Sequence, residues 1–282
     1  MAVLDAELVS LAAGFDIITL GMRADAARRA RHGERTTFVR VADVPAETGA
    51  EVAIPPSAGE VRVVGVPASR HAAIQRVREV RAAAGHAPLS GFGLDDLERL
   101  ALRDHVTLRG LLEDLRAAGL ECVAWAPVDR VQDPRGSIEE VNIAGLTLAR
   151  LTCQQWPADL LAFYARIAEL QRSVGVIRAF APLPRQWNPA APTTGYEDVK
   201  AVALARLVVD NVPSIQVDWS LYGPKLAQIA LMMGADDVDG VSAVDDDSLG
   251  RRRSPLEEIS RNIRAAGFEP VQRDGRFDAT DR

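Results

Sequence analysis

The chain has 282 residues, of which 48% are hydrophobic and 26% charged, and its formal net charge is −6 at pH 7. This length suits one large α/β domain, which can bury a sufficient core without disulfides or metals. The acidic balance disfavours a broad nucleic-acid footprint. No apolar run approaches the roughly 20 residues that a membrane-spanning helix needs. We therefore expect neither nucleic acid nor membrane as a partner.

The first five residues, Met1–Asp5, include an acidic residue and no basic segment. This composition does not predict a secretory signal, so we expect a cytoplasmic location. The two cysteines, Cys122 and Cys153, are interpreted as small buried residues rather than as a disulfide.

Strand-type apolar runs alternate with helical periodicity along most of the chain, which is typical of βα units around a parallel sheet. We interpret residues 1–282 as one barrel domain. Residues 1–35 form an N-terminal helical extension, with breaks expected at Gly14 or Gly21, and residues 275–282 form a frayed tail.

Eight strands are predicted: Thr36–Val41, Glu60–Val66, Pro88–Phe92, Glu121–Ala126, Leu146–Leu151, Ile177–Leu183, Ser214–Trp219 and Val238–Val241. Helices are predicted between most of them: His71–Ala84, Leu94–Ala118 with a break near Arg103–Val106, Pro157–Val174, Tyr196–Asn211, Gly223–Met233 and Pro255–Ala266, the last with a capping box at Ser254 and Glu257. This alternation predicts a (β/α) TIM-type barrel. Two connections, Ala42–Gly59 and Asp129–Ile143, are too short or irregular for a full crossover helix, so we expect a shortened or incomplete barrel there.

The C-terminal part carries a series of short motifs. In chain order they are Phe180-Ala181-Pro182-Leu183-Pro184, Asp198–Asn211, Ile215–Gly240, Ser254–Glu258 and Pro270–Asp274. This series resembles aminofutalosine synthase and cyclic dehypoxanthine futalosine synthase, radical-SAM enzymes of the futalosine route to menaquinone. The segment Leu20–Val39 resembles the start of the same family's barrel. The resemblance implies a TIM-type barrel with a role related to menaquinone biosynthesis.

The sequence departs from this family where the radical chemistry is housed. The family places a CxxxCxxC loop after its first strand, where three thiolates hold a [4Fe–4S] cluster. The corresponding loop, Ala42–Gly59, contains neither cysteine nor histidine. The family's paired SAM-binding glycines correspond to Gly65-Val66, and its acidic loop after the fourth strand corresponds to Trp125–Asp129. The resemblance therefore implies a homologue without the cluster motif, for which we expect no cofactor.

Candidate ligand-binding residues follow the seventh predicted strand, because barrel sites gather at the carboxyl ends of strands. Asp218, Trp219, Tyr222 and Lys225 lie here, and Gly223-Pro224 would begin a helix whose free N–H groups suit an anion. Lys225 is interpreted as an anion contact or, alternatively, as a solvated residue or a partner of Asp218.

A second group of candidates surrounds the eighth predicted strand. Asp236, Asp237 and Asp239 could hold a metal or act as acid and base, or could form a turn. Gly240 would allow backbone to approach a ligand. Asp239 and Gly240 are kept as binding candidates, and no metal is expected. The basic run Arg251–Arg253 is interpreted as a solvated face or an acidic partner's contact.

Two functional hypotheses follow. The first is a non-catalytic accessory subunit or ligand-binding pseudoenzyme, partnered by a radical-SAM homologue or a second copy, and binding a small anion or nucleoside. The alternative is a repurposed cluster-free lyase, hydrolase or isomerase acting on a futalosine-like or aromatic carboxylate compound. A third interpretation is a paralogue whose retained motifs preserve only its geometry.

Overall fold

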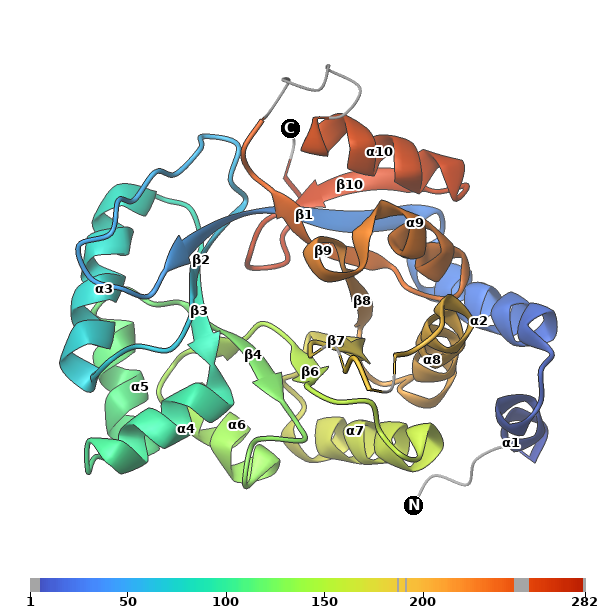
Figure 1. Ribbon diagram of the computed structural model, residues 1–282, viewed down its shortest axis with the longest axis horizontal. Helices are drawn as coiled ribbons and strands as arrows, with labels where there is room; N and C mark the ends of the chain where they lie inside the picture. The colour runs from blue at the N-terminus through green and yellow to red at the C-terminus, as the bar shows by residue number, and fades with distance from the viewer. Residues whose placement is uncertain (1–5, 187, 191, 246–253, 281–282) are drawn as a thin grey trace.

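The computed structural model describes residues 6–186, 188–190, 192–245 and 254–280. Within these ranges, parallel strands close into a barrel that helices surround (Figure 1). The barrel strands are β1 (Arg35–Pro45), β2 (Glu60–Val64), β3 (Leu89–Gly93), β4 (Cys122–Pro127), β6 (Leu151–Cys153), β7 (Ala179–Pro184), β8 (Ser214–Asp218) and β9 (Asp237–Ser242). The ring closes where β1 pairs with β9. The predicted TIM-type α/β fold is confirmed.

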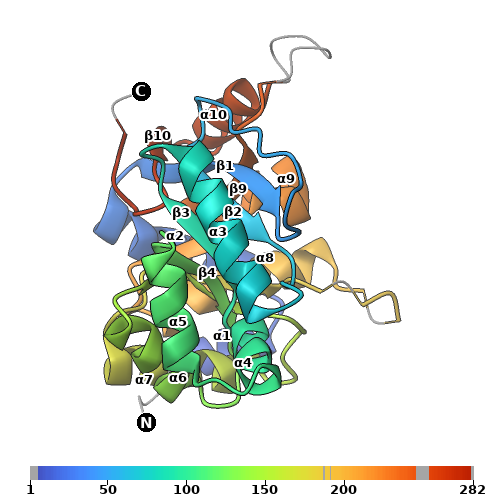
Figure 2. The same ribbon diagram turned by 90° about the vertical axis from the view of Figure 1, so that its left-hand side faces the viewer.

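Helices form the outer layer. They are α1 (Ala6–Ala13), α2 (Ile17–His32), α3 (Arg70–Ala84), α4 (Leu94–Arg103), α5 (Leu108–Ala117), α6 (Pro134–Ile143), α7 (Leu160–Val174), α8 (Gly195–Val208), α9 (Trp219–Met232) and α10 (Pro255–Ala265). Figure 2 shows α3 and α5 running side by side along the outside of the barrel. The break predicted near residues 103–106 separates α4 from α5, and the N-terminal extension breaks at residues 14–16.

The two connections that seemed irregular turn out differently. No helix forms in residues 46–59, yet the barrel is closed there because β1 and β2 pair directly, from Val41 with Glu60 to Pro45 with Val64. The expectation of a missing helix at residues 129–143 is wrong. Asp133 caps α6 by accepting from the Gly136 backbone N–H, and Pro134 occupies the first turn, where its missing N–H costs nothing.

The fifth predicted strand is divided into β5 (Thr147–Leu148) and β6, and a further strand, β10 (Glu269–Arg273), pairs with the first half of β1. The division falls at Ala149 and Arg150. The Arg150 side chain is buried and its Nε donates to the Ala124 carbonyl of β4 at 3.2 Å. A charged side chain thus enters the barrel at this irregularity.

The buried Arg28 connects helix α2 to the amino-terminal end of the barrel. Its guanidinium donates to the carbonyls of Ala235 (3.1 Å) and Gly33 (2.8 Å), and lies 3.6 Å from the centre of the Phe268 ring. Gly21 keeps α2 close to the barrel layer, since a Cβ there would lie 2.6 Å from the Met233 sulfur. The N-terminal extension is therefore an integral part of the packed structure.

The end of the described chain folds back on the barrel. The Gly275 N–H donates to the Gly59 carbonyl at 3.0 Å, and the Arg276 Nε donates to Glu121 at 2.7 Å. The Thr280 N–H donates to the Gln272 carbonyl at 2.9 Å. These hydrogen bonds hold residues 275–280 against the barrel, and the fraying of the tail stays a prediction.

Some expectations about termini and helix ends are refined. Ser254 is the N-cap of α10, but the reciprocal side-chain bonds of a capping box form at Thr194 and Glu197 of α8 instead. The run Arg251–Arg253 lies outside the described residues. Among the described helices, none has the length and apolar character needed to cross a bilayer.

The buried ion pair between Asp237 of β9 and Arg273 of β10 is expected to be important for stability. Arg273 donates to both carboxylate oxygens, at 2.6 and 2.7 Å, and both side chains are at most 2% exposed. Asp237→Ala would leave a buried unpaired guanidinium and should lower the free energy of unfolding by about 3–5 kcal/mol. Urea denaturation measures this loss.

The control is Glu140→Ala, which removes the exposed pair between Glu140 and Arg109. Its effect should be small, because exposed pairs are screened by water. Equal losses for the two variants would contradict the importance given to burial.

Candidate functional site

The barrel axis is occupied by two arginines and two carboxylates. Arg62 of β2 holds Asp239 of β9 with two hydrogen bonds, at 3.1 and 2.9 Å, and its Nε donates to Glu60 at 2.9 Å. Arg150 also contacts Asp239 and lies 4.0 Å from Glu60. These four side chains, which we call the axial quartet, are no more than 4% exposed.

The quartet is electrically balanced. Burial pushes the pKa of Glu60 upward, but Arg62 and Arg150 outweigh it, so the pKa of Glu60 lies below its usual value. Burial and the nearby Arg62 lower the pKa of Arg150. Two positive and two negative groups therefore neutralise one another, and the axis of the barrel is filled by the protein's own charges.

Asp218 organises the rim at the carboxyl end of the barrel. It caps α9, accepting from the Leu221 N–H at 3.1 Å and the Ser220 hydroxyl at 2.7 Å. Its other oxygen accepts from Arg185 at 2.9 Å, and the Arg185 guanidinium lies 4.8 Å from the centre of the Trp125 ring. Although burial alone would raise it, the pKa of Asp218 is lowered by Arg185 and by the Ser220 hydrogen bond. Asp218 is therefore ionised, and both of its carboxylate oxygens are used in capping α9 and in the pair with Arg185.

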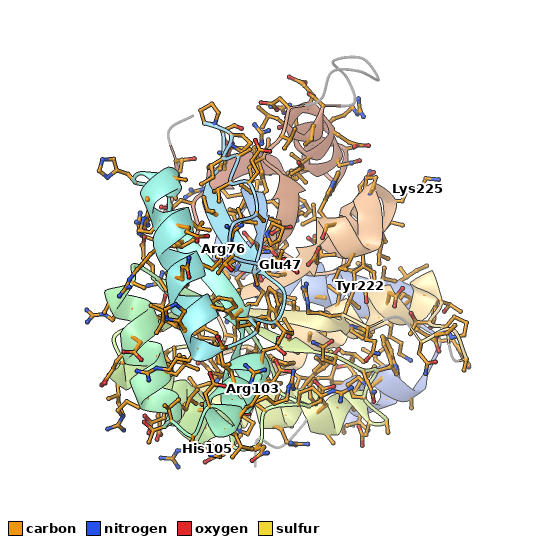
Figure 3. The ribbon with its side chains drawn as sticks, turned by 60° about the vertical axis from the view of Figure 1, so that its left-hand side comes forward. Glu47, Arg76, Arg103, His105, Tyr222 and Lys225 are labelled. Carbon is orange, nitrogen blue, oxygen red and sulfur yellow. The ribbon has the colours of Figure 1, made fainter. Side chains whose placement is uncertain are left out.

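The other candidates after β8 separate in space. The chain kinks at Gly223 (φ 72°, ψ 172°), inside the segment assigned as α9. Before the kink, Trp219 is half-buried, packed against the core, and the Tyr222 hydroxyl donates to the Pro184 carbonyl. After it, Lys225 is exposed and points away from the barrel (Figure 3). The structure therefore brings Asp218 and Tyr222 to the rim and places Lys225 on the outside.

The carboxylates around β9 are all paired with arginines. Asp236 pairs with Arg206, Asp237 with Arg273, and Asp239 with Arg62 and Arg150 of the axial quartet. In the described ranges, no group of three or more histidine, cysteine, aspartate or glutamate side chains could hold a metal ion. These aspartates therefore form ion pairs.

Gly240 allows a close approach, but the group that approaches is Asp218. Gly240 has φ 72°, and a Cβ there would lie 2.9 Å from an Asp218 carboxylate oxygen and 3.2 Å from the Ser220 hydroxyl. The glycine thus gives Asp218 the room to sit where it caps α9 and meets Arg185.

A cavity of about 740 Å³ opens beside the rim, at the carboxyl ends of β6 and β7 and the start of α9. Its aromatic lining is Trp156 and Tyr222, and its polar lining includes Arg185 and Glu197. The volume is in the range of small-molecule sites, about 300–1,000 Å³. We call it the rim cavity; it lies at the end of the barrel where TIM-type sites are found.

The donor set does not fit the family's iron–sulfur cluster. The Cys122 thiol shares a hydrogen bond with the Thr147 hydroxyl, and the Cys153 thiol donates to the Pro182 carbonyl. Burial raises the pKa of Cys122 to about 11 and of Cys153 to about 12, so neither thiol readily becomes the thiolate that ligates iron. Two separated thiols cannot replace three.

The loop between β1 and β2, where that family carries its cysteines, is held by Arg76 of α3. Arg76, labelled in Figure 3, donates to the carbonyls of Pro45 at 2.8 Å and Ala50 at 3.0 Å. It also pairs with Glu79. The loop is therefore fixed by backbone contacts to a helix that lies on the outside of the barrel.

Several residues at the site were missed in the sequence. Arg62 lies between Val61 and Val63 in β2. Because a charged residue in such an apolar strand is unusual, it could have predicted a charge inside the barrel. Arg185 follows directly after the motif Phe180–Pro184, at the expected end of a barrel strand. Trp125 and Trp156 carried no pattern that distinguished them from core residues.

The fold places the protein among known barrels. Methylornithine synthase (PylB) aligns with a TM-score of 0.63 at 13% identity, over 90% of this chain and 89% of that one. The hydrogenase maturase HydG from Carboxydothermus hydrogenoformans aligns with a TM-score of 0.60 at 12% identity, over 90% and 72%. At such low identity the likeness shows the fold alone. By fold, the protein belongs to the class of TIM-type α/β barrels.

The sequence gives a narrower relationship. Residues 183–282 match the family described as the CofH/MqnC C-terminal region. The aminodeoxyfutalosine synthase of Streptomyces coelicolor is 28% identical over 72% of this chain and 62% of its own length. The cyclic dehypoxanthine futalosine synthase of the same organism is 26% identical over 66% of this chain and 53% of its own. The chain is therefore related to the futalosine-pathway radical-SAM family, as the motifs predicted, and it matches less than two thirds of each of these curated relatives.

Replacement of Gly240 tests the packing of the rim. Gly240→Ala would introduce backbone strain and push Asp218 away from its capping position. Gly175→Ala is the matched control, because Gly175 also has a positive φ of 67° but nothing lies within 4 Å of its Cβ position. Chemical denaturation should show that Gly240→Ala costs roughly 1–2 kcal/mol more than the control. Equal costs would mean that Asp218 does not depend on the glycine.

Proposed function

We propose that this chain is a cluster-free ligand-binding relative of the futalosine-pathway radical enzymes, which binds a small molecule in the rim cavity and does not generate a radical. The observation that carries the proposal is the rim cavity itself. It opens at the carboxyl ends of strands, holds about 740 Å³, and combines aromatic with charged lining.

Two features of the chain argue against radical chemistry: the lack of cluster ligands and the axial quartet. The internal loop of residues 46–59 offers no thiolate or imidazole ligand. Arg62 and Arg150 place two fixed positive charges on the barrel axis, each already satisfied by carboxylates. The proposed function therefore includes no reaction step at an iron–sulfur cluster.

The lining of the rim cavity favours a ligand with a planar ring and an acidic group. Trp156 and Tyr222 offer apolar ring faces. Arg185 uses one terminal nitrogen for Asp218, and in the described residues no hydrogen bond uses the rest of its fork, which suits a carboxylate or phosphate. An aromatic carboxylate or a futalosine-like nucleoside has this combination of groups.

The relationship to the family suggests a place for this binding. The relatives are named as synthases, and that activity is theirs and is not assigned to this chain. For this chain we propose an accessory role, in which it holds a compound of that pathway alone or beside a radical-SAM homologue or a second copy. Such a role needs the rim cavity and no cluster.

Calorimetric titration of the full chain tests the proposal. We expect futalosine-type nucleosides or 3-(carboxyvinyloxy)benzoate to bind the wild-type protein. Trp156→Ala and Arg185→Gln should each weaken binding about tenfold or more, since each removes one recognition element. Lys225→Ala is the matched control and should bind normally, because its side chain points away from the barrel (Figure 3). Failure of every compound to bind the folded protein would contradict the proposal.

A second candidate function, a cluster-free lyase, hydrolase or isomerase, is favoured by Asp43 of β1. Asp43 is exposed on one side, and it makes no hydrogen bond or ion pair with the described residues. On its other side it faces the charges of Arg62, Glu60 and Asp218. Partial burial raises the pKa of Asp43, and Arg62 offsets this only in part. A carboxylate with a raised pKa at the mouth of a barrel is suited to acid–base chemistry.

If Asp43 acts as a base, its raised pKa sets the pH dependence. The carboxylate keeps its proton to a higher pH than an ordinary aspartate, so turnover should rise with pH through that raised pKa. Asp43→Asn should remove this limb of the pH–rate profile and reduce turnover by roughly 10²-fold or more. Measured turnover that keeps both its rate and its pH limb in Asp43→Asn would exclude this role.

A further inference from the structure

A second cavity lies at the opposite, amino-terminal end of the barrel. It has a volume of about 450 Å³, is open to solvent, and is lined by the starts of β4 and β5, by Arg178 before β7 and by the C-terminal tail. Three arginines line it: Arg116, Arg178 and Arg276. Glu121 and Asp278 also line the cavity, so its three positive side chains exceed its two negative ones.

Acidic groups at this cavity pair with Arg276 but leave Arg116 and Arg178 without a carboxylate partner among the described residues. Glu121 is shared between two of the chain's arginines, accepting from Arg81 at 3.0 Å and from Arg276 at 2.7 and 3.0 Å. Arg178 donates only to the backbone carbonyl of Arg276, and Asp278 makes no side-chain bond within the described ranges. The Arg116 side chain, which is exposed to solvent, makes no ion pair or hydrogen bond with the described part of the chain.

The position of Arg116 depends on a glycine. Its side chain lies against Gly145, where a Cβ would come within 2.7 Å of the Arg116 Nε. Gly145 has φ 76°, a conformation that other residues rarely adopt. An unpaired guanidinium is thus accommodated at the cavity by a residue that leaves room for it.

The tail presents the third arginine from a fixed turn. The Asp274 carboxylate accepts from the N–H groups of Arg276 at 2.8 Å and Asp278 at 3.0 Å. Arg273, which is anchored to Asp237, lies 4.1 Å from the centre of the Phe277 ring. The turn therefore holds the Arg276 backbone against the barrel, next to Arg178.

We propose that this cavity binds a small oxyanion, a carboxylate or a phosphate, through the free donors of Arg116 and Arg178, with Arg276 closing one side. Planar guanidinium forks match the oxygens of these anions, and charge-assisted hydrogen bonds are stronger than neutral ones. The proposal concerns the end of the barrel away from the rim cavity and does not depend on the proposed function.

Titration of the full chain with inorganic phosphate and with citrate, in chloride buffers of matched ionic strength, tests this site. We expect saturable binding of at least one of these anions by calorimetry, with a matching rise in Tm. Arg116→Gln and Arg178→Gln should each weaken it about tenfold or more. Phosphate binding without citrate binding would assign a phosphate group, and the reverse would assign a carboxylate.

The matched control is Arg172→Gln, which removes an exposed arginine of α7 that pairs with Glu169. This variant should bind the anion as the wild type does. The proposal is overturned if neither anion binds saturably, or if Arg172→Gln weakens binding as much as the cavity variants.

Discussion

The buried hydrogen bonds between Arg62 and Asp239 are the interaction on which the interior of this barrel depends. An arginine and an aspartate taken out of water are costly unless each satisfies the other, and removal of one leaves the other unpaired. Here Glu60 and Arg150 complete the balance, so four charges from β2, β9 and the junction of β5 and β6 become mutually dependent. The quartet therefore couples strands on different sides of the barrel and fixes how they face its axis.

The quartet also limits the open space inside the barrel. Because the quartet fills the axis, the rim cavity opens beside it, next to Arg185 and Tyr222 at the start of α9. Gly240 permits this arrangement by leaving room for the Asp218 carboxylate. The same carboxylate cannot easily serve chemistry, since it caps a helix and pairs with an arginine. A free carboxylate at the mouth is found instead in Asp43.

The order of elements was predictable because it depends on local periodicity. Alternating apolar residues identified strands such as β2 and β8, and the break between α4 and α5 followed from the interrupted helical pattern. Helix α6 was missed because Asp133-Pro134 is equally typical of a turn and of a helix start. Arg185 and Asp218 are 33 residues apart, so their pairing depends on tertiary structure. The direction of Lys225 is set by the kink at Gly223, which sequence spacing does not determine.

Anaerobic iron–sulfide reconstitution of the full chain, with a cluster-containing radical-SAM relative treated in parallel, tests most directly whether this chain can hold a cluster. Iron and sulfide analysis, together with electron paramagnetic resonance of the reduced protein, would detect a [4Fe–4S] centre. The account predicts no stoichiometric cluster in this chain, because its two buried thiols are already hydrogen-bonded and too few. A stoichiometric [4Fe–4S] cluster, with its characteristic signal, would contradict it.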